Sequence, residues 1–537
     1  MKKNLSILLL SCALIGLFTA CKKDFLTEKP YSSYTPATLN DSLGFEASIF
    51  GLYNHLASFF TNSGSQGWLC VWQVGTDIAF SGQPQGIEVP YYDYNTLTST
   101  DGAASYTWSW CYRTINNCNI IIQSIEDPNL TGMGQDNKNS IDAEAKFFRG
   151  YAYNILATCF GGVPIITQPL NGPKTDFVRA PLDSVNALVE SDLQYASTYL
   201  PEVDEQKKNA TGVLYERANK YQAMQLLAEA YLRMDKNAEA EQQAQAIINS
   251  GKFSLIHERY GIKANQPGDY FSDMFWYGNE RRSQGNTEAI WVLEQENPAN
   301  VVGGTQDAGQ QRRVWNSAYY QITGMTICDS LGGRGLARLR LDNWVIYGLY
   351  DSSDMRNSEY NLRRHYYYNT PGDPNFGKEV PYVGQDTIYK ICPVTTKWYQ
   401  YDPNDVFGYG TIKDIILMRL GETYLLLAEA QVKQGKLEEA AASINVLRER
   451  AQAPMVTASQ MDLNFVLDER ARELVGEENR RMTLMRTKTL VERTNRLNTG
   501  SVLYPITGLS EKNELMPIPQ SEIDLNKDAV LEQNPGY

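Results

Sequence analysis

The chain has 537 residues, with 49 Lys and Arg against 62 Asp and Glu, which gives a formal net charge of −13. This acidic balance, without a basic run, argues against binding to nucleic acid and against electrostatic docking on anionic lipid. Length alone allows two to four domains. Only three His are present, and no two of the six cysteines after Cys21 form a C-x-x-C pair. A Cys/His metal site is therefore not expected, and we interpret most of these thiols as buried apolar side chains, with any disulfide undecided.

The first twenty residues have the layout of a signal peptide. Two lysines precede an apolar run from Leu5 to Phe18, which is shorter than the roughly 20 residues that a spanning helix needs. Small residues and then Cys21 follow, and Leu17–Cys21 resembles a lipobox, in which the Cys is acylated and becomes the new N-terminus. We therefore predict export and a lipid anchor on Cys21, which holds firmly when several acyl chains are attached.

Helical spacing of apolar residues continues through the first half of the chain. It predicts helix pairs around 106–126, 140–160 and 181–200. The segment before them, 61–105, is rich in turn-forming residues and is expected to be mostly loop.

An internal repeat is the clearest helical signal. The sequence Leu-Ala-Glu-Ala occurs at 227–230 and again at 427–430, and each copy leads through a turn residue, Asp235 or Gly435, into a second stretch with small residues at matching offsets. This is the tetratricopeptide (TPR) pattern, in which small residues let two paired helices approach closely.

Between 253 and 412 helical periodicity mostly lapses. Gly, Pro, Asn, Asp and Tyr crowd together, with the strand-like run 289–293 and the turn 371–374. A long irregular excursion inside a helical protein is usually functional, because loops on a rigid scaffold carry binding residues. Helices of the repeat are expected to resume near Ile412.

These patterns predict a mainly α fold, a TPR-like helix-pair scaffold with a large loop-rich insertion containing short strands. The expected segments are the signal peptide 1–20, the lipidated N-terminus and first helix 21–60, the loop-rich ligand-face segment 61–105, TPR-like helix pairs 106–252, the irregular ligand-face insertion 253–412, and the last helix pair with the C-terminal tail 413–537.

Six motifs stand in order along the chain. They are Cys21–Leu26; Tyr112–Asn119; Ala143–Tyr151 with Phe160–Pro164; Asp354–Arg356; Arg419–Tyr424; and Met516–Ile523 with Gln533–Tyr537. In this order they resemble the SusD/RagB family, outer-membrane nutrient-binding lipoproteins of Bacteroidetes. One departure is the end region, where Arg472–Leu474 is not followed by the aromatic-rich Trp-Phe-Asp segment usual in that family, so the resemblance is to a divergent member.

The resemblance implies a fold, a partner and a location. Four TPR-like helix pairs would pack on a SusC-like TonB-dependent transporter barrel, and the loop-rich insertions would present a glycan site on the other side. The lipid on Cys21 would hold the protein in the outer membrane, facing the cell exterior. A protein of this kind is not an enzyme and needs no cofactor, although a structural cation is left open.

The common catalytic motifs are absent from the sequence. No H-E-x-x-H, G-x-S-x-G, Walker or EF-hand pattern occurs. A glycosidase needs two carboxylates at a set separation, which one sequence cannot show. Asp351 and Asp354 are the pair to consider, but a loop cap and an ion pair to Arg356 explain them better.

Sugar binding asks for other residue types. Flat aromatic rings stack on the apolar faces of a pyranose, and Asp, Asn and Arg bond its hydroxyls. The residues predicted to bind ligand are Trp72, Asp77, Tyr91, Tyr92, Tyr94, Trp276, Trp315, Tyr319 and Tyr320. The three tyrosines at 91–94 are favoured, since both faces of a period-two segment should not be buried in a short surface loop. Trp108 and Trp291 are expected in the core instead.

Three functional hypotheses remain at this point. The first is a cell-surface protein that captures glycan and delivers it to a TonB-dependent transporter for uptake. The alternatives are a TPR-type adaptor lipoprotein that binds only protein, and a surface glycoside hydrolase. The sequence does not name the sugar.

Overall fold

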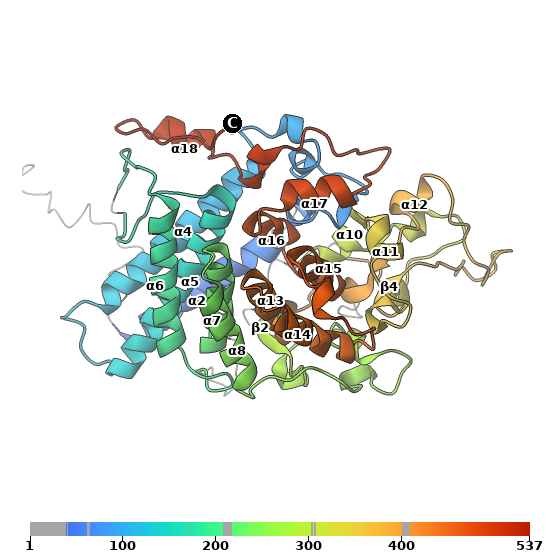
Figure 1. Cartoon of the computed structure of the whole chain (residues 1–537), viewed down its shortest axis with the longest axis horizontal. Helices are drawn as coiled ribbons and strands as arrows, with labels where there is room; N and C mark the ends of the chain where they lie inside the picture. Colours follow the sequence, from blue (N-terminus) through green and yellow to red (C-terminus); the bar gives the residue numbers. More distant parts are fainter. Residues whose placement is uncertain are drawn as a thin grey trace, which may run out of the picture.

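Figure 1 shows the computed structural model of the chain, which describes residues 39–537 except 40, 62–64, 171, 208–216, 302–303, 306–307, 400–406 and 409. The predicted signal peptide and Cys21 lie outside the described residues. Within the described ranges, none of the helices combines the length and apolar character needed to cross a membrane.

The scaffold is a row of helices in which each member packs against the next (Figure 1). The row consists of α4 (Gly102–Ile125), α5 (Gln135–Phe160), α6 (Leu182–Tyr199), α7 (Lys220–Arg233), α8 (Asn237–Asn249), α13 (Leu420–Lys433) and α14 (Leu437–Arg450). The first helix, α2 (Ser42–Thr61), lies against α4 and α5. The mainly helical prediction is confirmed, and the predicted helices near 106–126, 140–160 and 181–200 are α4, α5 and α6.

The two repeat copies form the matching pairs α7–α8 and α13–α14, and α8 packs directly on α13. Asp235 and Gly435 occupy equivalent turns and both have positive φ, 57° and 74°. Gly adopts this left-handed conformation freely, and Asp is one of the few other residues that tolerates it. The helical row is therefore continuous, although the whole insertion separates α8 from α13 in sequence.

The insertion contains short elements rather than a large sheet. Its helices are α9 (Tyr270–Asp273), α10 (Gln311–Trp315), α11 (Asn343–Tyr347) and α12 (Asp386–Tyr389). Three antiparallel strand pairs occur in the described chain: β1 (Ala79–Ser81) with β3 (Leu339–Leu341), β2 (Ala289–Leu293) with β6 (Ile415–Arg419), and β4 (Leu362–Arg363) with β5 (Val394–Thr395).

The predicted strand at 289–293 is confirmed as β2, but the expected return to helix near Ile412 is wrong. Residues Ile415–Arg419 form strand β6, which pairs with β2, and α13 begins only at Leu420. An unbroken apolar run of this length fits a buried strand as well as a helix turn, so its pairing partner decided the outcome.

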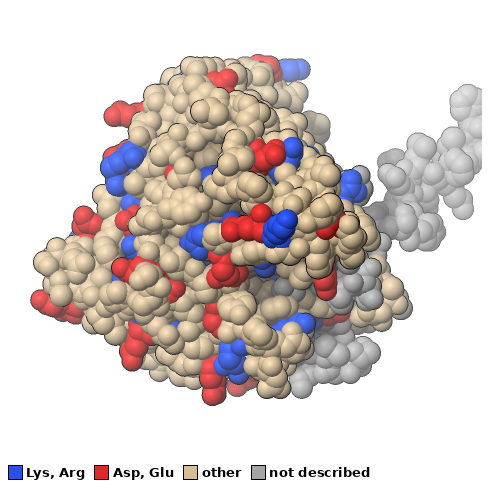
Figure 2. All heavy atoms as spheres, turned by 90° about the vertical axis from the view of Figure 1, so that its right-hand side faces the viewer, with Lys and Arg blue, Asp and Glu red and all other residues tan. Residues whose placement is uncertain are grey.

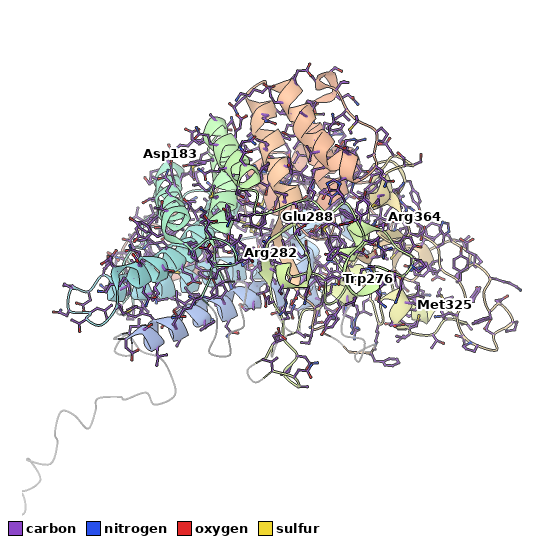
Figure 3. All side chains as sticks on the ribbon, turned by 90° about the horizontal axis from the view of Figure 1, so that it is seen from below. Asp183, Trp276, Arg282, Glu288, Met325 and Arg364 are labelled. Carbon is purple, nitrogen blue, oxygen red and sulfur yellow. The ribbon has the colours of Figure 1, made fainter. Side chains whose placement is uncertain are left out.

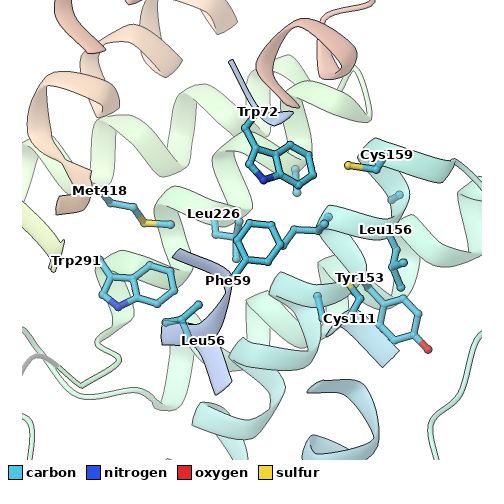
Figure 4. Close-up of a cluster of buried hydrophobic side chains, with 14 of the residues drawn as sticks. Leu56, Phe59, Trp72, Cys111, Tyr153, Leu156, Cys159, Leu226, Trp291 and Met418 are labelled. Atoms are coloured by element: carbon cyan, nitrogen blue, oxygen red, sulfur yellow. The ribbon is translucent and has the colours of Figure 1, made fainter. Parts of the chain in front are cut away.

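The core joins the scaffold to the insertion (Figure 4). Trp291 of β2 packs at 5.3 Å between ring centroids on Phe147 of α5, and Phe59 of α2 stacks on Trp72 at 5.6 Å. Trp291 and Trp108 are 1% and 3% exposed, which confirms both as core residues. Five of the six described cysteines are buried and Cys328 is half-buried, and all six are free thiols.

The C-terminal helices complete the molecule. They are α15 (Leu463–Leu474), α16 (Arg480–Arg486), α17 (Leu490–Leu497) and α18 (Gln520–Leu525). In Figure 1, α18, α17 and α16 lie along the upper side, whereas α15 packs beside α13. The short helix α3 (Gln66–Val71) packs on α10 of the insertion.

A buried ionic cluster, which we call the Glu473 network, fixes the insertion to these helices. Glu473 of α15 pairs with Arg356 at 2.9 Å, with Arg419 at 2.5 Å and with Arg450, and Arg450 also pairs with Glu288 at 2.6 Å. Burial alone would raise the pKa of Glu473, but the three guanidinium groups outweigh it and hold the pKa well below its ordinary value. The network thus ties Glu288 and Arg356 of the insertion, and Arg419 of β6, to α14 and α15.

Candidate functional site

Most of the side chains predicted to bind ligand are inside the protein. Trp276 and Tyr320 are partly exposed, whereas the other seven are buried. The buried residues are Trp72, Asp77, Tyr91, Tyr92, Tyr94, Trp315 and Tyr319. As they stand, these seven side chains do not offer a surface to a ligand.

The favoured tyrosine platform is the clearest correction. Tyr91 and Tyr94 belong to two turns of 3₁₀ helix, Val89–Tyr91 and Tyr94–Thr96, so their side chains do not alternate as in a strand. The Tyr91 hydroxyl donates to Asp101 at 2.7 Å, and Arg481 donates to the Tyr94 hydroxyl at 2.8 Å. The Arg481 guanidinium lies 4.9 Å and 5.7 Å from the centroids of these two rings. The tyrosines bury this cation rather than forming a sugar platform.

The other buried residues also have structural partners. Asp77 pairs with Arg480 at 2.6 Å and with Arg493 at 2.7 Å. Burial opposes ionisation of Asp77, but the two arginines outweigh it and lower its pKa. The Tyr319 hydroxyl donates to the carbonyl of Cys328 at 3.1 Å, and Trp315 is 4% exposed. The Asp77 pairs thus fix its loop to α16 and α17, and the Tyr319 bond joins two parts of the insertion.

Trp276 lies beside a groove in the loop-rich part of the chain. In Figure 3 the residue is labelled below the scaffold helices. The groove has a volume of about 200 Å³. Sites that enclose a drug-sized ligand measure about 300–1,000 Å³. The Trp276 groove is lined by Pro267, Ser272, Phe275, Trp276, Ser330, Glu359, Tyr360, Asn361, Arg363, Thr396, Lys397 and Tyr399.

Asp269 organises two walls of the Trp276 groove. Its carboxylate caps α9 by accepting from the backbone N–H of Ser272 at 2.7 Å. The same carboxylate accepts from Ser358 at 2.6 Å and from the Asn361 amide at 3.0 Å. The pairing of β4 with β5 then brings residues 396–399 alongside. Three segments far apart in sequence are thereby locked around one opening.

Two residues that line the groove carry polar atoms without partners. Asn361 Oδ1 and Arg363 Nε are buried and lack a hydrogen-bond partner among the described residues. The Arg363 guanidinium lies 5.4 Å from the centroid of the Tyr399 ring. Native proteins rarely leave such atoms unpaired, because an unmade hydrogen bond in a buried position is costly. A ligand with hydroxyl or anionic groups would satisfy them.

Aromatic surface is available next to these atoms. The Tyr360 side chain is 45% exposed, and Trp276 is partly exposed with the Lys263 ammonium 5.1 Å from its ring centroid. Lys397, at the base, pairs with Glu477. Burial lowers the pKa of Lys397 to about 8, and Glu477 partly opposes this shift. The groove therefore offers two ring faces, an amide oxygen and a guanidinium group.

The loop-rich end carries further exposed rings. Tyr347 is 59% exposed and Tyr382 is 41% exposed, and the Tyr382 hydroxyl accepts from Arg340 at 2.9 Å. Figure 2 shows this end of the molecule, where acidic and basic side chains are interspersed among uncharged ones. A face of this mixed character lacks the continuous basic patch that is typical of nucleic-acid binding.

The acid pair considered for catalysis has a structural role, as expected. Asp354 accepts from the backbone N–H of Arg356 at 2.9 Å and pairs with its guanidinium at 2.8 Å. Asp351 pairs with Arg448 at 2.8 Å. Among the residues that the structure describes, no three His, Cys, Asp or Glu side chains are grouped so as to hold a metal ion.

Sequence reasoning missed most of the Trp276 groove. Tyr360, Asn361 and Arg363 closely follow the Asp354–Arg356 motif in a loop-rich segment. An aromatic ring, an amide and a cation within four residues could have indicated a binding site there. These residues lie beside Trp276 because Asp269 hydrogen-bonds Ser358 and Asn361, and no local sequence pattern predicts those contacts.

Two family models match the chain. The model described as "SusD family" covers residues 339–537, and the model described as "Starch-binding associating with outer membrane" covers residues 24–232. SusD-like protein P25 of Formosa agariphila is 24% identical, with 96% of each chain covered.

Solved structures agree with this match. A SusD homologue from Bacteroides thetaiotaomicron superposes with a TM-score of 0.72 at 20% identity, covering 94% of this chain and 98% of that one. A structure titled "Laminarin binding SusD-like protein" has a TM-score of 0.68 at 20% identity and covers 93% and 100% of the two chains. From the two family models, the full-length relative and the shared fold, we conclude that the chain belongs to the SusD/RagB family.

Proposed function

We propose that the protein binds glycan in the Trp276 groove and passes it to a SusC-like TonB-dependent transporter, without catalysing a reaction. The observation that carries this proposal is the groove itself, where the exposed faces of Trp276 and Tyr360 adjoin the unpartnered Asn361 Oδ1 and Arg363 Nε. Stacking on ring faces and bonding of hydroxyls are the two interactions by which proteins hold sugars. Tyr320, also partly exposed, is not among the residues that line the groove and stays a candidate contact.

The relatives support the ligand class and the location. One similar structure is titled as laminarin-binding and another as a surface glycan-binding protein from Bacteroides fluxus, and one family description names starch and the outer membrane. We propose by extension that a lipid on Cys21 anchors this chain in the outer membrane, facing outward. Anchoring beside the transporter would raise the effective concentration of a modest-affinity binder.

Calorimetry of the full chain in detergent against a panel of oligosaccharides tests the proposal. Trp276→Ala should weaken binding roughly tenfold with an unchanged melting temperature, since a ring stack is worth about 1 kcal/mol or more. Tyr91→Ala should lower the melting temperature and leave glycan affinity unchanged, because the Tyr91 ring packs on Arg481 inside the protein.

Three results would contradict the proposal. Release of reducing ends from a bound glycan would show an enzyme. Loss of affinity in Tyr91→Ala but not in Trp276→Ala would place the site elsewhere. Absence of glycan binding, with co-purification of the transporter, would favour a protein-binding adaptor.

A further inference from the structure

Arg363 differs from the other cation that lines the Trp276 groove. Lys397 pairs with Glu477, whereas Arg363 has no carboxylate within ion-pair distance among the described residues. The Arg363 guanidinium lies beside the Tyr399 side chain, 5.4 Å from the ring centroid. By contrast, the buried Arg356 and Arg419 of the Glu473 network each pair with three carboxylates. A guanidinium that lines a groove without an ion-paired carboxylate is therefore available to an external anion.

Most acidic side chains near the groove already form hydrogen bonds or ion pairs within the protein. Asp269 accepts from Ser272, Ser358 and Asn361, and Glu477 pairs with Lys397 and Arg419.

Glu359 is the exception among these acids. It is exposed and accepts the backbone N–H of Arg364 at 3.3 Å. Against this one rim carboxylate stand the Arg363 guanidinium and the Lys263 ammonium, which lies 5.1 Å from the Trp276 ring centroid and has no ion pair among the described residues. Cations are in excess over uncommitted acids around the groove.

We propose that the groove selects a glycan whose sugar ring carries an anionic substituent, a carboxylate or a sulfate, and that the Arg363 guanidinium binds that substituent. Trp276 and Tyr360 would contact the ring faces, and Asn361 Oδ1 would accept a hydroxyl. A guanidinium presents donors in a planar fork that matches two oxygens of a carboxylate or sulfate. This inference rests on the proposed function and specifies its ligand.

Matched pairs of ligands test it with the unaltered full chain in detergent. The first pair is oligogalacturonate and its methyl ester, which share a backbone and differ in charge. The second pair is a sulfated galactan oligosaccharide and its desulfated form. The charged member of one pair should bind about 10–100-fold more tightly, as expected for hydrogen bonds to a charged group. Which pair responds distinguishes carboxylate from sulfate, and the preference should shrink with added salt.

Variants then assign the effect to one side chain. Arg363→Gln should abolish the preference for the charged member and leave affinity for the neutral member unchanged. Arg363→Lys should retain part of the preference, because it keeps the positive charge. Arg282→Gln is the matched control, because Arg282 lies outside the groove and pairs with the exposed Asp204. It removes the same charge and should leave the preference intact.

The outcomes separate this inference from the proposed function. Equal binding of charged and neutral members by the unaltered protein overturns the anionic ligand and leaves glycan binding standing. Failure of every glycan to bind overturns the proposed function and the inference with it. The comparison of charged and neutral ligands uses the unaltered chain, so it tests the anionic ligand even if an Arg363 variant does not fold.

Discussion

Replacing Glu473 by Gln removes the central charge of the Glu473 network while keeping the side-chain volume. Glu473 is fully buried and contacts three guanidinium groups, those of Arg356, Arg419 and Arg450. Each arginine keeps at least one other carboxylate, but three buried cations would then share fewer negative charges. Removing one member of a buried ion pair typically costs about 3–5 kcal/mol, because the partner charge is left uncompensated.

This cost can be expressed as a shift in melting temperature. The unfolding entropy of globular proteins is about 2.1 cal/mol/K per residue, which gives about 1 kcal/mol/K for a chain of roughly 500 residues. A loss of about 3–5 kcal/mol therefore lowers the melting temperature by about 3–5 °C. The network also holds Glu288 and Arg419 at the ends of β2 and β6, so the insertion should loosen first.

Differential scanning calorimetry at pH 7 measures the shift. Glu492→Gln is the matched control, because Glu492 forms an i,i+4 pair with Arg496 in which both side chains are about half exposed. Exposed pairs contribute about 0–1 kcal/mol, so this variant should melt within about 1 °C of the wild type. If Glu473→Gln also melts within that margin at pH 7, the network does not stabilise the fold and the reasoning fails.

The remaining predictions concern the turn, the buried acids and pH. Both turn positions have positive φ, which Gly adopts freely, so Asp235→Gly should raise the free energy of unfolding in urea by up to about 1 kcal/mol. Gly435→Ala should lower it by about 1–2 kcal/mol through backbone strain alone, because a Cβ at 435 meets no atom within 4 Å. A destabilising Asp235→Gly or a stabilising Gly435→Ala would refute the equivalence of the two turns. Asp77→Asn should lower stability by about 3 kcal/mol and leave glycan affinity unchanged, since its two arginine partners are internal; a loss of affinity at constant stability would restore Asp77 as a ligand residue. Burial opposes ionisation of Glu469, but three arginines hold its pKa at about 2. Its stabilisation is therefore complete above the unfolded pKa of about 4.3 and is lost as the pH falls from about 5 towards 2; urea unfolding at pH 7, 4 and 3 should show the decline, and a constant free energy would count against it.

Patterns repeated at short range were enough to predict the scaffold from the sequence. Leu-Ala-Glu-Ala at 227–230 and 427–430 specified two equivalent helix pairs, since small residues at fixed offsets let paired helices approach closely. The apolar run around Trp291 specified a buried strand, and Asp354 beside Arg356 specified a cap with an ion pair. The residues of each pattern lie close together along the chain, so their spacing carries the information, whereas the strand that pairs with β2 is distant in sequence.

Tertiary structure alone decided which aromatic rings meet solvent. Tyr91 and Tyr94 are buried because Arg481, distant in sequence, fills the space between their loop and the C-terminal helices. Trp276 stays accessible because Asp269 draws the segment around Asn361 to one side of it and leaves a groove. Periodicity reports that a face is apolar, but it does not report what covers that face, because the covering residues come from other parts of the chain.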